Sequence, residues 1–546
     1  MKGLVQIISY AIKMAKTEVK DTMTLEELEK NIQTLIPDLV TAAEKPAVYN
    51  PFISNLKMNT FDIVQMVLLC FLIPIRMTLL LLSFIFGGLI AKLFLIGFKE
   101  SSPPVPMTGF RRFGQQIMWF FARCCAYACG FHHITVKGKL AGPEEAPVVV
   151  CAPHSTFIDG LAFGRKLGLV SAVSRIENLS AFLIGSCVRI IQPVAVSRAD
   201  RDSKTKVVKE IKRRAKEGNW PPIIIFPEGT CTNRKCFITF KPGAFYPGVP
   251  VQPLLVKFKD KLDYATWSWI GLGVLPLLCI MMSRIKNNME IEILPVYKPS
   301  KEEKEDAFLY ARNVRAYMAS VGGVPVTDHS YEDCRLMTEA KKLGLPMQAG
   351  LVEYYKLSPM IGMNCDCMIE YFRKFAKIDQ NCDGVISLEE FCDYLNLPPT
   401  EEIKTIFRIY DIDKDSSITF REYLLGCFLI STPFNTDSNI SMAFNLFDSS
   451  CNDYITFESF SELLTTVMDL HEVYIRRMYE ELDSEDSGKV TIDNFRNFCL
   501  QKPEYALLFI HFRNLQSRSS SMTFSPTHLR SGSVTDFQYA EPGVSM

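Results

Sequence analysis

The apolar residues of this chain are unevenly distributed, and the most apolar stretch runs from Phe61 to Phe98. Its second half, Met77–Phe98, supplies about twenty apolar residues interrupted only by Lys92, enough to cross a hydrocarbon core of ~30 Å. Because a charge at the middle of a bilayer costs about 2.5–3.5 kcal/mol, we expect Arg76, just before this half, to lie near a membrane interface. The pattern predicts a membrane anchor over residues 57–100, either one spanning helix with a lead-in or a helical hairpin that enters from one side.

Short apolar runs alternate with amphipathic segments between about residue 130 and residue 330. A short, continuous apolar run is typical of a strand that is covered on both faces. Asp202–Glu217 instead places its apolar residues on one stripe and ends at Gly218, which is typical of the crossover helix of a βαβ unit. We therefore predict an α/β domain, a mixed sheet with flanking helices, over residues 101–330. The expected strands are His133–Leu140, Val148–Ala152, Arg189–Val196, Ile223–Phe226, Val251–Phe258 and Glu290–Val296.

A second uncharged block, Trp267–Met282, is shorter than a membrane span and contains glycines. We interpret it as buried lining of the α/β domain or as a patch at a membrane interface, rather than as a transmembrane helix.

The C-terminal part of the chain repeats an acidic pattern about every thirty residues, with starts at Asp379, Asp411, Asp448 and Asp483. The first two repeats place oxygen-bearing residues at the ligand positions of a calcium-binding EF-hand loop. The second has Ser416 where glycine is expected, a left-handed position that we expect to cost about 1 kcal/mol and to lower the affinity. The predicted ligands are Asp379, Asn381, Asp383, Val385 (carbonyl), Ser387 and Glu390 in the first loop, and Asp411, Asp413, Asp415, Ser417 (carbonyl), Thr419 and Glu422 in the second.

The third and fourth repeats are degenerate. The third has Asp453 in place of glycine and Ser459 in place of the closing glutamate, and the fourth keeps Gly488 but ends in Asn494. We expect both to bind calcium poorly and to persist as packing partners. In the first pair, Ile386 and Ile418 occupy matching positions and are expected to pair the two loops. The sequence thus predicts an all-α EF-hand domain over residues 365–515, with two intact and two degenerate loops.

The remaining segments carry less information. Residues 1–56 show no signal-peptide layout and receive no function, residues 331–364 are expected to be a linker, and the Ser-rich tail 516–546 is expected to be disordered. The formal net charge is zero, which gives no indication of a nucleic-acid partner. The seventeen cysteines have no framework spacing and indicate reduced thiols in a chain that faces the cytosol.

Polar residues follow directly after two of the apolar runs. Val148–Ala152 is followed by His154 and Asp159, and Ile223–Phe226 is followed by Glu228. Because the carboxyl ends of parallel strands meet at one edge of a sheet, we expect these groups to share a crevice. An imidazole held by a carboxylate is a general base that works near neutral pH. A rival mechanism uses Ser155, Cys151 or Cys231 as a covalent nucleophile activated by His154.

The neighbouring residues suit substrate binding. Gly229 permits a close backbone approach to a ligand, and Thr230 with nearby N–H groups is suited to stabilising an oxyanion. Arg198 follows a third strand end, at Val194–Val196, and is a fixed cation suited to phosphate. Arg234 and Lys241 are weaker candidates for phosphate contacts.

Four segments in this order resemble the motifs of the glycerophospholipid acyltransferase family: His154–Asp159, Val194–Arg198, Phe226–Thr230 and Val249–Pro253. With a membrane segment before them and EF-hands behind, the chain is similar to the lysophosphatidylcholine acyltransferase type 1/type 2 group, closest to type 2. The resemblance implies that His154, oriented by Asp159, takes the proton from the sn-2 hydroxyl of a lysophospholipid, which then attacks an acyl-CoA thioester without a catalytic metal. It also implies that Glu228, Gly229 and Thr230 contact the acyl acceptor and that Arg198 contacts its phosphate.

Several alternatives stay open at this stage. The acceptor is lysophosphatidylcholine or lyso-PAF, lysophosphatidic acid, or a lipid with another head group, and the donor carries a long-chain or an acetyl group. An alternative from another functional class is that the chain is a catalytically inactive, calcium-responsive membrane adaptor. The expected partners are a phospholipid bilayer, the lysophospholipid and acyl-CoA substrates and Ca²⁺, with no nucleic acid and with the oligomeric state open. Basic residues that follow the anchor place the catalytic domain and the EF-hands in the cytosol by the positive-inside rule: Lys99, Arg111, Arg112, Arg123, Lys137 and Lys139. The resemblance implies residence in the endoplasmic reticulum membrane, with the Golgi or lipid droplets as alternatives.

Overall fold

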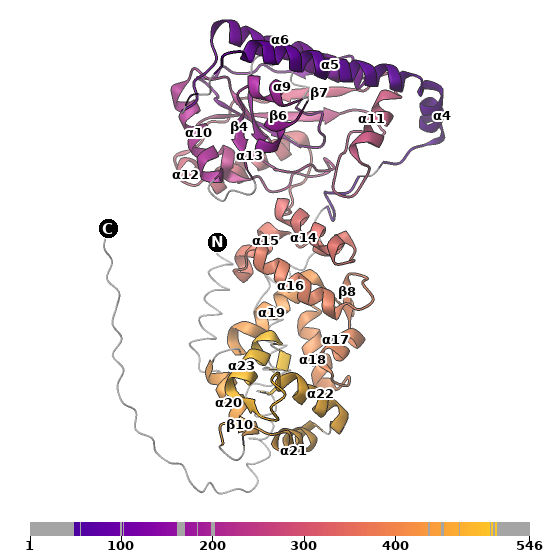
Figure 1. The fold of residues 1–546 in the computed structure, drawn as a ribbon, viewed down its shortest axis with the longest axis vertical. Coiled ribbons are helices and arrows are strands. Elements are labelled where there is room, and N and C mark those ends of the chain that lie inside the picture. The colour runs from indigo at the N-terminus through magenta and orange to yellow at the C-terminus, as the bar shows by residue number, and fades with distance from the viewer. Residues whose placement is uncertain are drawn as a thin grey trace, which may run out of the picture. The chain divides into compact units, whose positions relative to one another are not determined.

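The computed structural model describes residues 48–509, except 55, 99–100, 102, 161–169, 183, 198–202, 435–436, 449–451, 469, 503 and 506–507. Arg198, residues 1–47 and the predicted tail 516–546 lie outside this set. The described chain divides into a larger unit, which includes residues 48–387 and Ser417–Leu424, and a smaller unit, which includes Leu388–Ser416 and residues 425–509 (Figure 1).

A seven-stranded mixed sheet forms the centre of the larger unit, in the order β1-β7-β6-β2-β5-β3-β4. All neighbouring strands are parallel except β6 and β7, which are antiparallel. The mixed α/β sheet predicted from the sequence is thus confirmed. The strands are β1 (Ile134–Lys137), β2 (Val148–Ala152), β3 (Ser171–Arg175), β4 (Val194–Val196), β5 (Ile223–Ile225), β6 (Val251–Phe258) and β7 (Met289–Ile293).

Strand β2 explains how this sheet is covered, because all five of its residues are fully buried. Val149 and Cys151 face one hydrophobic core, together with residues of α6, α11 and β7. Val148, Val150 and Ala152 face the other, together with residues of α10 and α13. A strand sandwiched in this way needs an unbroken apolar sequence, which is the pattern seen in the chain. The helices concerned are α6 (Gly109–Ala128), α10 (Ser203–Glu217), α11 (Val274–Met282) and α13 (Ala307–Gly322).

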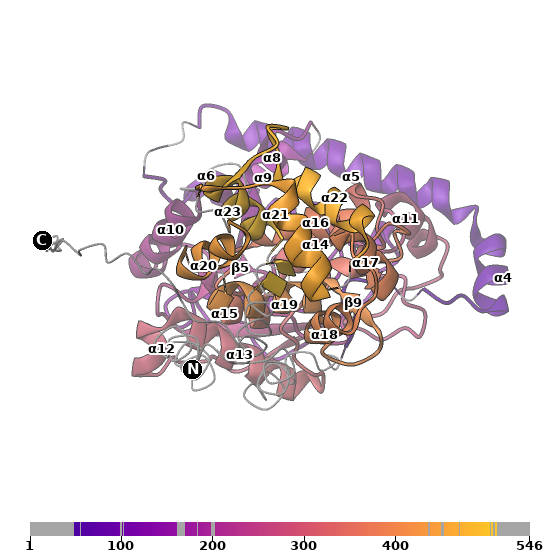
Figure 2. The ribbon, with the colours of Figure 1, turned by 90° about the horizontal axis from the view of Figure 1, so that it is seen from below.

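The predicted membrane segment forms two helices, α4 (Thr60–Leu69) and α5 (Leu72–Leu95). Among the described residues, α5 alone is both long and apolar enough to cross a membrane. Figures 1 and 2 show it lying along α6 at the edge of the larger unit. Its buried stripe is rich in small residues, which allow a close approach of helices: Leu80, Ser83, Gly87, Gly88, Ala91 and Phe94.

Arg76 fixes the start of α5 to the end of α11. Its guanidinium donates hydrogen bonds to the carbonyl oxygens of Met282 (2.9 Å), Arg284 (2.5 Å) and Ile285 (3.1 Å). These carbonyls follow the last turn of a helix, where a cation is favoured.

The packing of α5 on α6 gives a first prediction. A Cβ atom at Gly114 of α6 would lie 2.4 Å from the ring of Phe94, so the helices must move apart in Gly114→Ala. We expect a loss of about 1–3 kcal/mol in the free energy of unfolding, read from denaturant unfolding in detergent. Gly142→Ala is the matched control, because no atom lies within 4 Å of the added methyl group. Equal stability of the two variants would contradict the described packing.

The linker predicted over residues 331–364 is wrong. This interval forms α14 (Tyr331–Lys342), the 3₁₀ turn η2 (Met347–Gly350) and α15 (Tyr354–Ile361), and Cys334 and Met337 are buried in a core with Phe52. The boundary predicted at residue 365 is also displaced, because α16 (Cys365–Ile378) belongs to the larger unit. Ion pairs tie it to α14, between Arg335 and Asp366 at 2.7 Å and between Arg373 and Glu339 at 2.9 Å.

The remaining elements are short. The helices of the larger unit also include α8 (Ile176–Ser180), α9 (Gly185–Ile190) and α12 (Lys301–Glu305), with the 3₁₀ turn η1 (Pro242–Ala244). The EF-hand region contains α17 (Leu388–Leu395), α18 (Glu401–Tyr410), α19 (Phe420–Phe434), α20 (Asp437–Phe447), α21 (Phe457–Met468), α22 (Glu472–Leu482) and α23 (Ile492–Gln501). Two small antiparallel ladders accompany them, β8 (Val385–Ser387) with β9 (Ser417–Thr419), and β10 (Tyr454–Ile455) with β11 (Val490–Thr491).

Candidate active site and calcium-binding loops

His154 and Asp159 form a hydrogen-bonded pair directly after β2. His154 Nδ1 lies 3.0 Å from Asp159 Oδ2, which also accepts the backbone N–H groups of Ser155 (2.8 Å) and Thr156 (3.1 Å). Asp159 is fully buried, whereas the histidine side chain is 23% exposed. The imidazole stacks on the ring of Phe226, with 4.2 Å between ring centroids. The ring is therefore held at Nδ1 and on one face, and among the described residues no hydrogen bond to Nε2 is found.

The turn after β5 lies beside this pair. The backbone N–H of His154 donates to Glu228 Oε2 at 2.7 Å, and the N–H of Thr232 donates to the carbonyl of His154 at 2.7 Å. The parallel pairing of β2 with β5 brings the two turns to the same edge of the sheet. The two turns that we expect to share a crevice therefore lie next to each other.

Glu228 is completely buried, so its carboxyl group faces the protein rather than solvent. Its pKa is raised to about 8, mainly by burial and to a smaller extent by nearby Asp159, while the N–H of His154 and the buried guanidinium of Arg315 act in the opposite direction. Arg315 is itself held by the carbonyl of Thr327 at 2.9 Å. Glu228 is therefore protonated over most of the neutral pH range, and its carboxyl group accepts the backbone N–H of His154.

Gly229 adopts a φ of +69°, and a Cβ atom there would lie 3.1 Å from Lys241 Cε. The glycine is thus needed both for its left-handed conformation and for the close approach of the lysine. The ammonium group of Lys241 lies over the ring of Tyr331, 4.3 Å from its centroid, and 3.5 Å from Glu332. Of the weaker phosphate candidates, Lys241 is the one that borders the Glu228–Thr230 turn.

Thr230 and Arg234 both have partners inside the protein. The hydroxyl of Thr230 accepts the indole N–H of Trp269 at 2.7 Å. Arg234 pairs with Asp263 at 2.5 Å and stacks on Phe258, so its charge is already balanced. A phosphate contact by Arg234 is therefore not supported.

The side chains of the rival covalent mechanism are poorly placed to act as nucleophiles. Cys151 is fully buried, and burial raises the pKa of both the Cys151 and Cys231 thiols, which disfavours the reactive thiolate. Ser155 is also fully buried, and its hydroxyl has no hydrogen-bond partner among the described protein groups.

A segment near the N-terminus supports the site and was missed from the sequence. The side chain of Asn233 donates to the carbonyls of Asn50 (3.0 Å) and Ile53 (3.2 Å), and Ser54 N–H donates to the carbonyl of Ile270 at 2.8 Å. Phe52 is completely buried here. No local pattern shows such a role, because every partner is more than a hundred residues away.

The first calcium loop is held in a compact turn by Asp379. Its carboxylate accepts the backbone N–H groups of Gly384 (2.9 Å) and Asp383 (3.2 Å), and Gly384 has a φ of +92°. Ile386 pairs with Ile418 in the β8–β9 ladder, as predicted.

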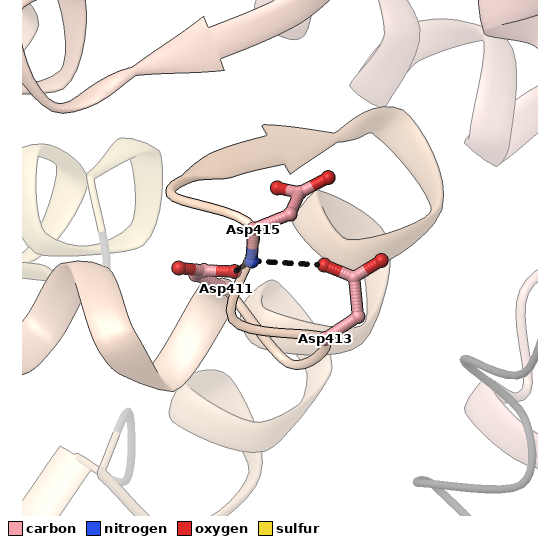
Figure 3. Close-up of side chains that lie close together, drawn as sticks. All are labelled: Asp411, Asp413 and Asp415. Carbon is pink, nitrogen blue, oxygen red and sulfur yellow. Dashed lines mark hydrogen bonds between the residues drawn. The ribbon is translucent and has the colours of Figure 1, made fainter.

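The second loop brings three carboxylates together. Oxygen atoms of Asp411, Asp413 and Asp415 lie within 4.8 Å of one another (Figure 3). Burial raises the pKa of Asp411, and the charges of Asp415 and Asp413 add to this effect. An all-oxygen set with mutual repulsion fits a hard divalent cation such as Ca²⁺. On the following segment, Glu422 accepts the N–H and hydroxyl of Thr419, at 2.9 and 2.7 Å.

The degenerate loops keep the same turn. Asp453 stands in the glycine position with a φ of +64°, and Gly488 has a φ of +70°. Ile455 pairs with Val490, so these loops also form a ladder. Their predicted role as packing partners fits this geometry.

Ser416 allows a direct test of the second loop. Its φ is +67°, the left-handed conformation in which a side chain is strained. Ser416→Gly should relieve about 1 kcal/mol and raise calcium affinity about fivefold, measured by calorimetric titration. Gly384→Ser should lower the affinity of the first loop by a similar factor, and unchanged affinity in both variants would contradict this reading.

The model of the family described as "Acyltransferase" matches residues 133–257, the range that contains His154 and Asp159. A second model, "EF-hand domain pair", matches residues 369–427, the two intact loops.

Relatives that align with most of this chain identify its family within the acyltransferases. Lysophosphatidylcholine acyltransferase 2 of Danio rerio is 42% identical over 86% of this chain and 89% of its own length, and that of Homo sapiens is 42% identical over 86% and 87%. Lysophosphatidylcholine acyltransferase 2B of Rattus norvegicus is 37% identical over 92% and 96%. This chain belongs to the lysophosphatidylcholine acyltransferase family. The solved structure of the acyltransferase PlsC from Thermotoga maritima aligns with 47% of this chain and 96% of its own chain, at 17% sequence identity. The TM-score of this alignment is 0.33, which is too low to support a structural comparison.

Proposed function

We propose that this enzyme transfers an acyl group from acyl-CoA to the free sn-2 hydroxyl of lysophosphatidylcholine during phospholipid remodelling. The observation that carries the proposal is the pair after β2, in which fully buried Asp159 holds His154 Nδ1 at 3.0 Å while the histidine side chain stays 23% exposed. The family relationship supports this acceptor.

The reaction needs one proton carrier. His154 Nε2 accepts the hydroxyl proton of the lysolipid, and Asp159 stabilises the imidazolium that forms. The acceptor oxygen attacks the thioester carbon, the C–O bond forms and the C–S bond breaks. The CoA thiolate leaves and takes up the proton from His154, so the base is restored.

The surrounding groups divide into binding and positioning roles. Gly229 allows the close approach of Lys241, whose ammonium group is suited to a phosphate. Arg198 is retained as a phosphate ligand because it follows β4, the edge strand of the same sheet. Glu228 acts as a positioning residue, since its buried carboxyl group accepts the N–H of His154.

Calcium is proposed as the ligand of the first two EF-hand loops. The oxygen donors and the paired β8–β9 ladder support this assignment. The α5 helix and the basic residues that follow it support an enzyme of the endoplasmic reticulum membrane whose catalytic domain and EF-hands face the cytosol.

A transfer assay on the full chain in membranes tests the proposal. Lysophosphatidylcholine, lyso-PAF and lysophosphatidic acid are each combined with acetyl-, palmitoyl- and arachidonoyl-CoA, with calcium or with a chelator. We expect diacyl product and free CoA thiol in equal amounts, with lysophosphatidylcholine as the preferred acceptor. Preference for lysophosphatidic acid would reassign the head group, and calcium-dependent partner binding without turnover would favour an inactive adaptor.

A further inference from the structure

The loop that precedes α11, together with the first turn of this helix, exposes a cluster of apolar side chains; Trp267–Pro276 is called the loop below. Leu275 is 63% exposed, Trp267 and Trp269 are each 38% exposed, and Leu272 and Val274 are also exposed. The sequence contains no charged residue between Thr266 and Ser283. Soluble surfaces rarely keep such a contiguous apolar patch without a partner, so the loop is a candidate docking surface.

This loop is bonded to both turns of the active site. The backbone N–H of Trp267 donates to the carbonyl of Ser155 at 2.8 Å, and its ring meets that of Phe157 edge-on at 5.8 Å. The indole N–H of Trp269 donates to Thr230. Because this N–H is satisfied inside the protein, the exposed part of Trp269 is its hydrocarbon ring.

The loop also adjoins the membrane anchor. It leads into α11, which lies beside α5 in both views (Figures 1 and 2). Arg76 of α5 is bonded to the carbonyls at the end of α11, and Arg284 approaches Asp62 of α4 at 3.8 Å. Helix α5 also exposes large apolar side chains, among them Leu82, Phe86, Leu89 and Leu93. Through α11, the loop is therefore connected to both helices of the membrane anchor.

We propose that Trp267–Pro276 is a second membrane-docking element, which enters the interfacial layer of a phospholipid bilayer and opens the active site directly onto it. Tryptophan is enriched at this depth of a membrane, and the exposed Lys261 and Lys286 flank the apolar block as partners for lipid phosphates. This inference rests on the proposed function, because a lysolipid moving within the leaflet would reach His154 without leaving the interface.

Tryptophan fluorescence measures the depth of the loop. The chain has four tryptophans, so W119F/W220F leaves only the two in the loop. This variant is bound to phosphatidylcholine vesicles whose acyl chains carry bromine close to the ester groups. We expect strong quenching by the bromolipid and weak quenching by aqueous iodide, and the opposite result would overturn the proposal.

The functional test compares L272S/L275S with L500S, which changes an equally apolar residue, 51% exposed, in the smaller unit. Because removing two leucines withdraws apolar area from the bilayer, we expect L272S/L275S to lower turnover of vesicle-bound lysophosphatidylcholine about tenfold. Turnover of a short-chain, monomeric lysophosphatidylcholine should be unchanged, and L500S should match the parent on both substrates.

Equal losses on both substrates, or no loss on either, would overturn the docking role. An oligomer that depends on these leucines, with no bromolipid quenching, would assign the loop to a second copy of the chain and also overturn it. Absence of turnover by the parent chain on either substrate would refute the proposed function instead, and the quenching result would then decide the docking role alone.

Discussion

His154→Ala is expected to lower acyl transfer to lysophosphatidylcholine by about 10²–10⁴-fold, the usual contribution of a general base. The physical reason is the bond from Nδ1 to buried Asp159, which fixes the ring with Nε2 free to take the hydroxyl proton. Transfer rates are measured at saturating acyl-CoA in membranes that contain equal amounts of each variant. Asp159→Asn should also lower the rate, because an amide cannot stabilise the imidazolium that forms.

The matched control for this experiment is His133→Ala, since His133 is an exposed histidine just before β1. It should leave the rate unchanged. If His154→Ala retained turnover, the base would have to be another group, and the assignment of the site after β2 would fail.

The second large effect is expected at Glu228, where two substitutions should differ. Glu228→Ala leaves the buried N–H of His154 unsatisfied, which costs about 1–3 kcal/mol of stability. It also frees the catalytic turn, and a displacement near 1 Å lowers the rate by about 10²-fold. Glu228→Gln keeps an oxygen that accepts the same N–H and should retain most of the activity. If the glutamine variant were as inactive as the alanine variant, the carboxylate would bind substrate directly.

The Glu228→Gln variant also gives a prediction about the pH dependence of stability. The pKa of Glu228 is raised from 4.5 to about 8 in the folded enzyme by burial. The folded state therefore binds more protons than the unfolded state between these values, so this group lowers stability as pH rises from 4.5 to 8. Thermal unfolding scans should show that Glu228→Gln removes this loss and stabilises the enzyme most, relative to the parent, above pH 8. A parallel pH dependence of the two proteins would contradict the buried, protonated state.

Sequence reasoning located the fold and the catalytic pair wherever a local pattern carried the information. Val148–Ala152 and Val251–Phe258 were predicted with the observed ends, because unbroken apolar runs mark strands that are covered on both faces. The strand predicted at Arg189–Val196 is wrong in its first half, since Arg189 and Ile190 end α9. A short apolar run fits either a buried strand or a helical turn, and only tertiary packing decides between them. Strand β3 was missed because Ser171–Arg175 has few apolar residues.

The roles within the site were harder to predict because they depend on partners distant in the sequence. Arg234 is a candidate for a phosphate contact by its position in the chain, but in the fold it pairs with Asp263, 29 residues away. The hydroxyl of Thr230 accepts the indole N–H of Trp269, a partner 39 residues away that no motif indicates, and keeps its own O–H as a donor. Arg315, which lies near buried Glu228, stands on α13 and carries no motif. Spacing along the chain identifies residues whose side chains are suited to binding a substrate. Only the fold shows which of these side chains form hydrogen bonds or ion pairs with other parts of the protein.

The attachment of α5 affects how this enzyme should be prepared for study. A fragment that begins after residue 98 could be made to avoid the use of detergent. This truncation would expose the apolar side of α6, and three carbonyl groups near α11 would lose their hydrogen bonds to the Arg76 guanidinium. Such a fragment would aggregate or lose the alignment of its lipid entry, so nanodiscs that carry the full chain are the appropriate setting for kinetic work.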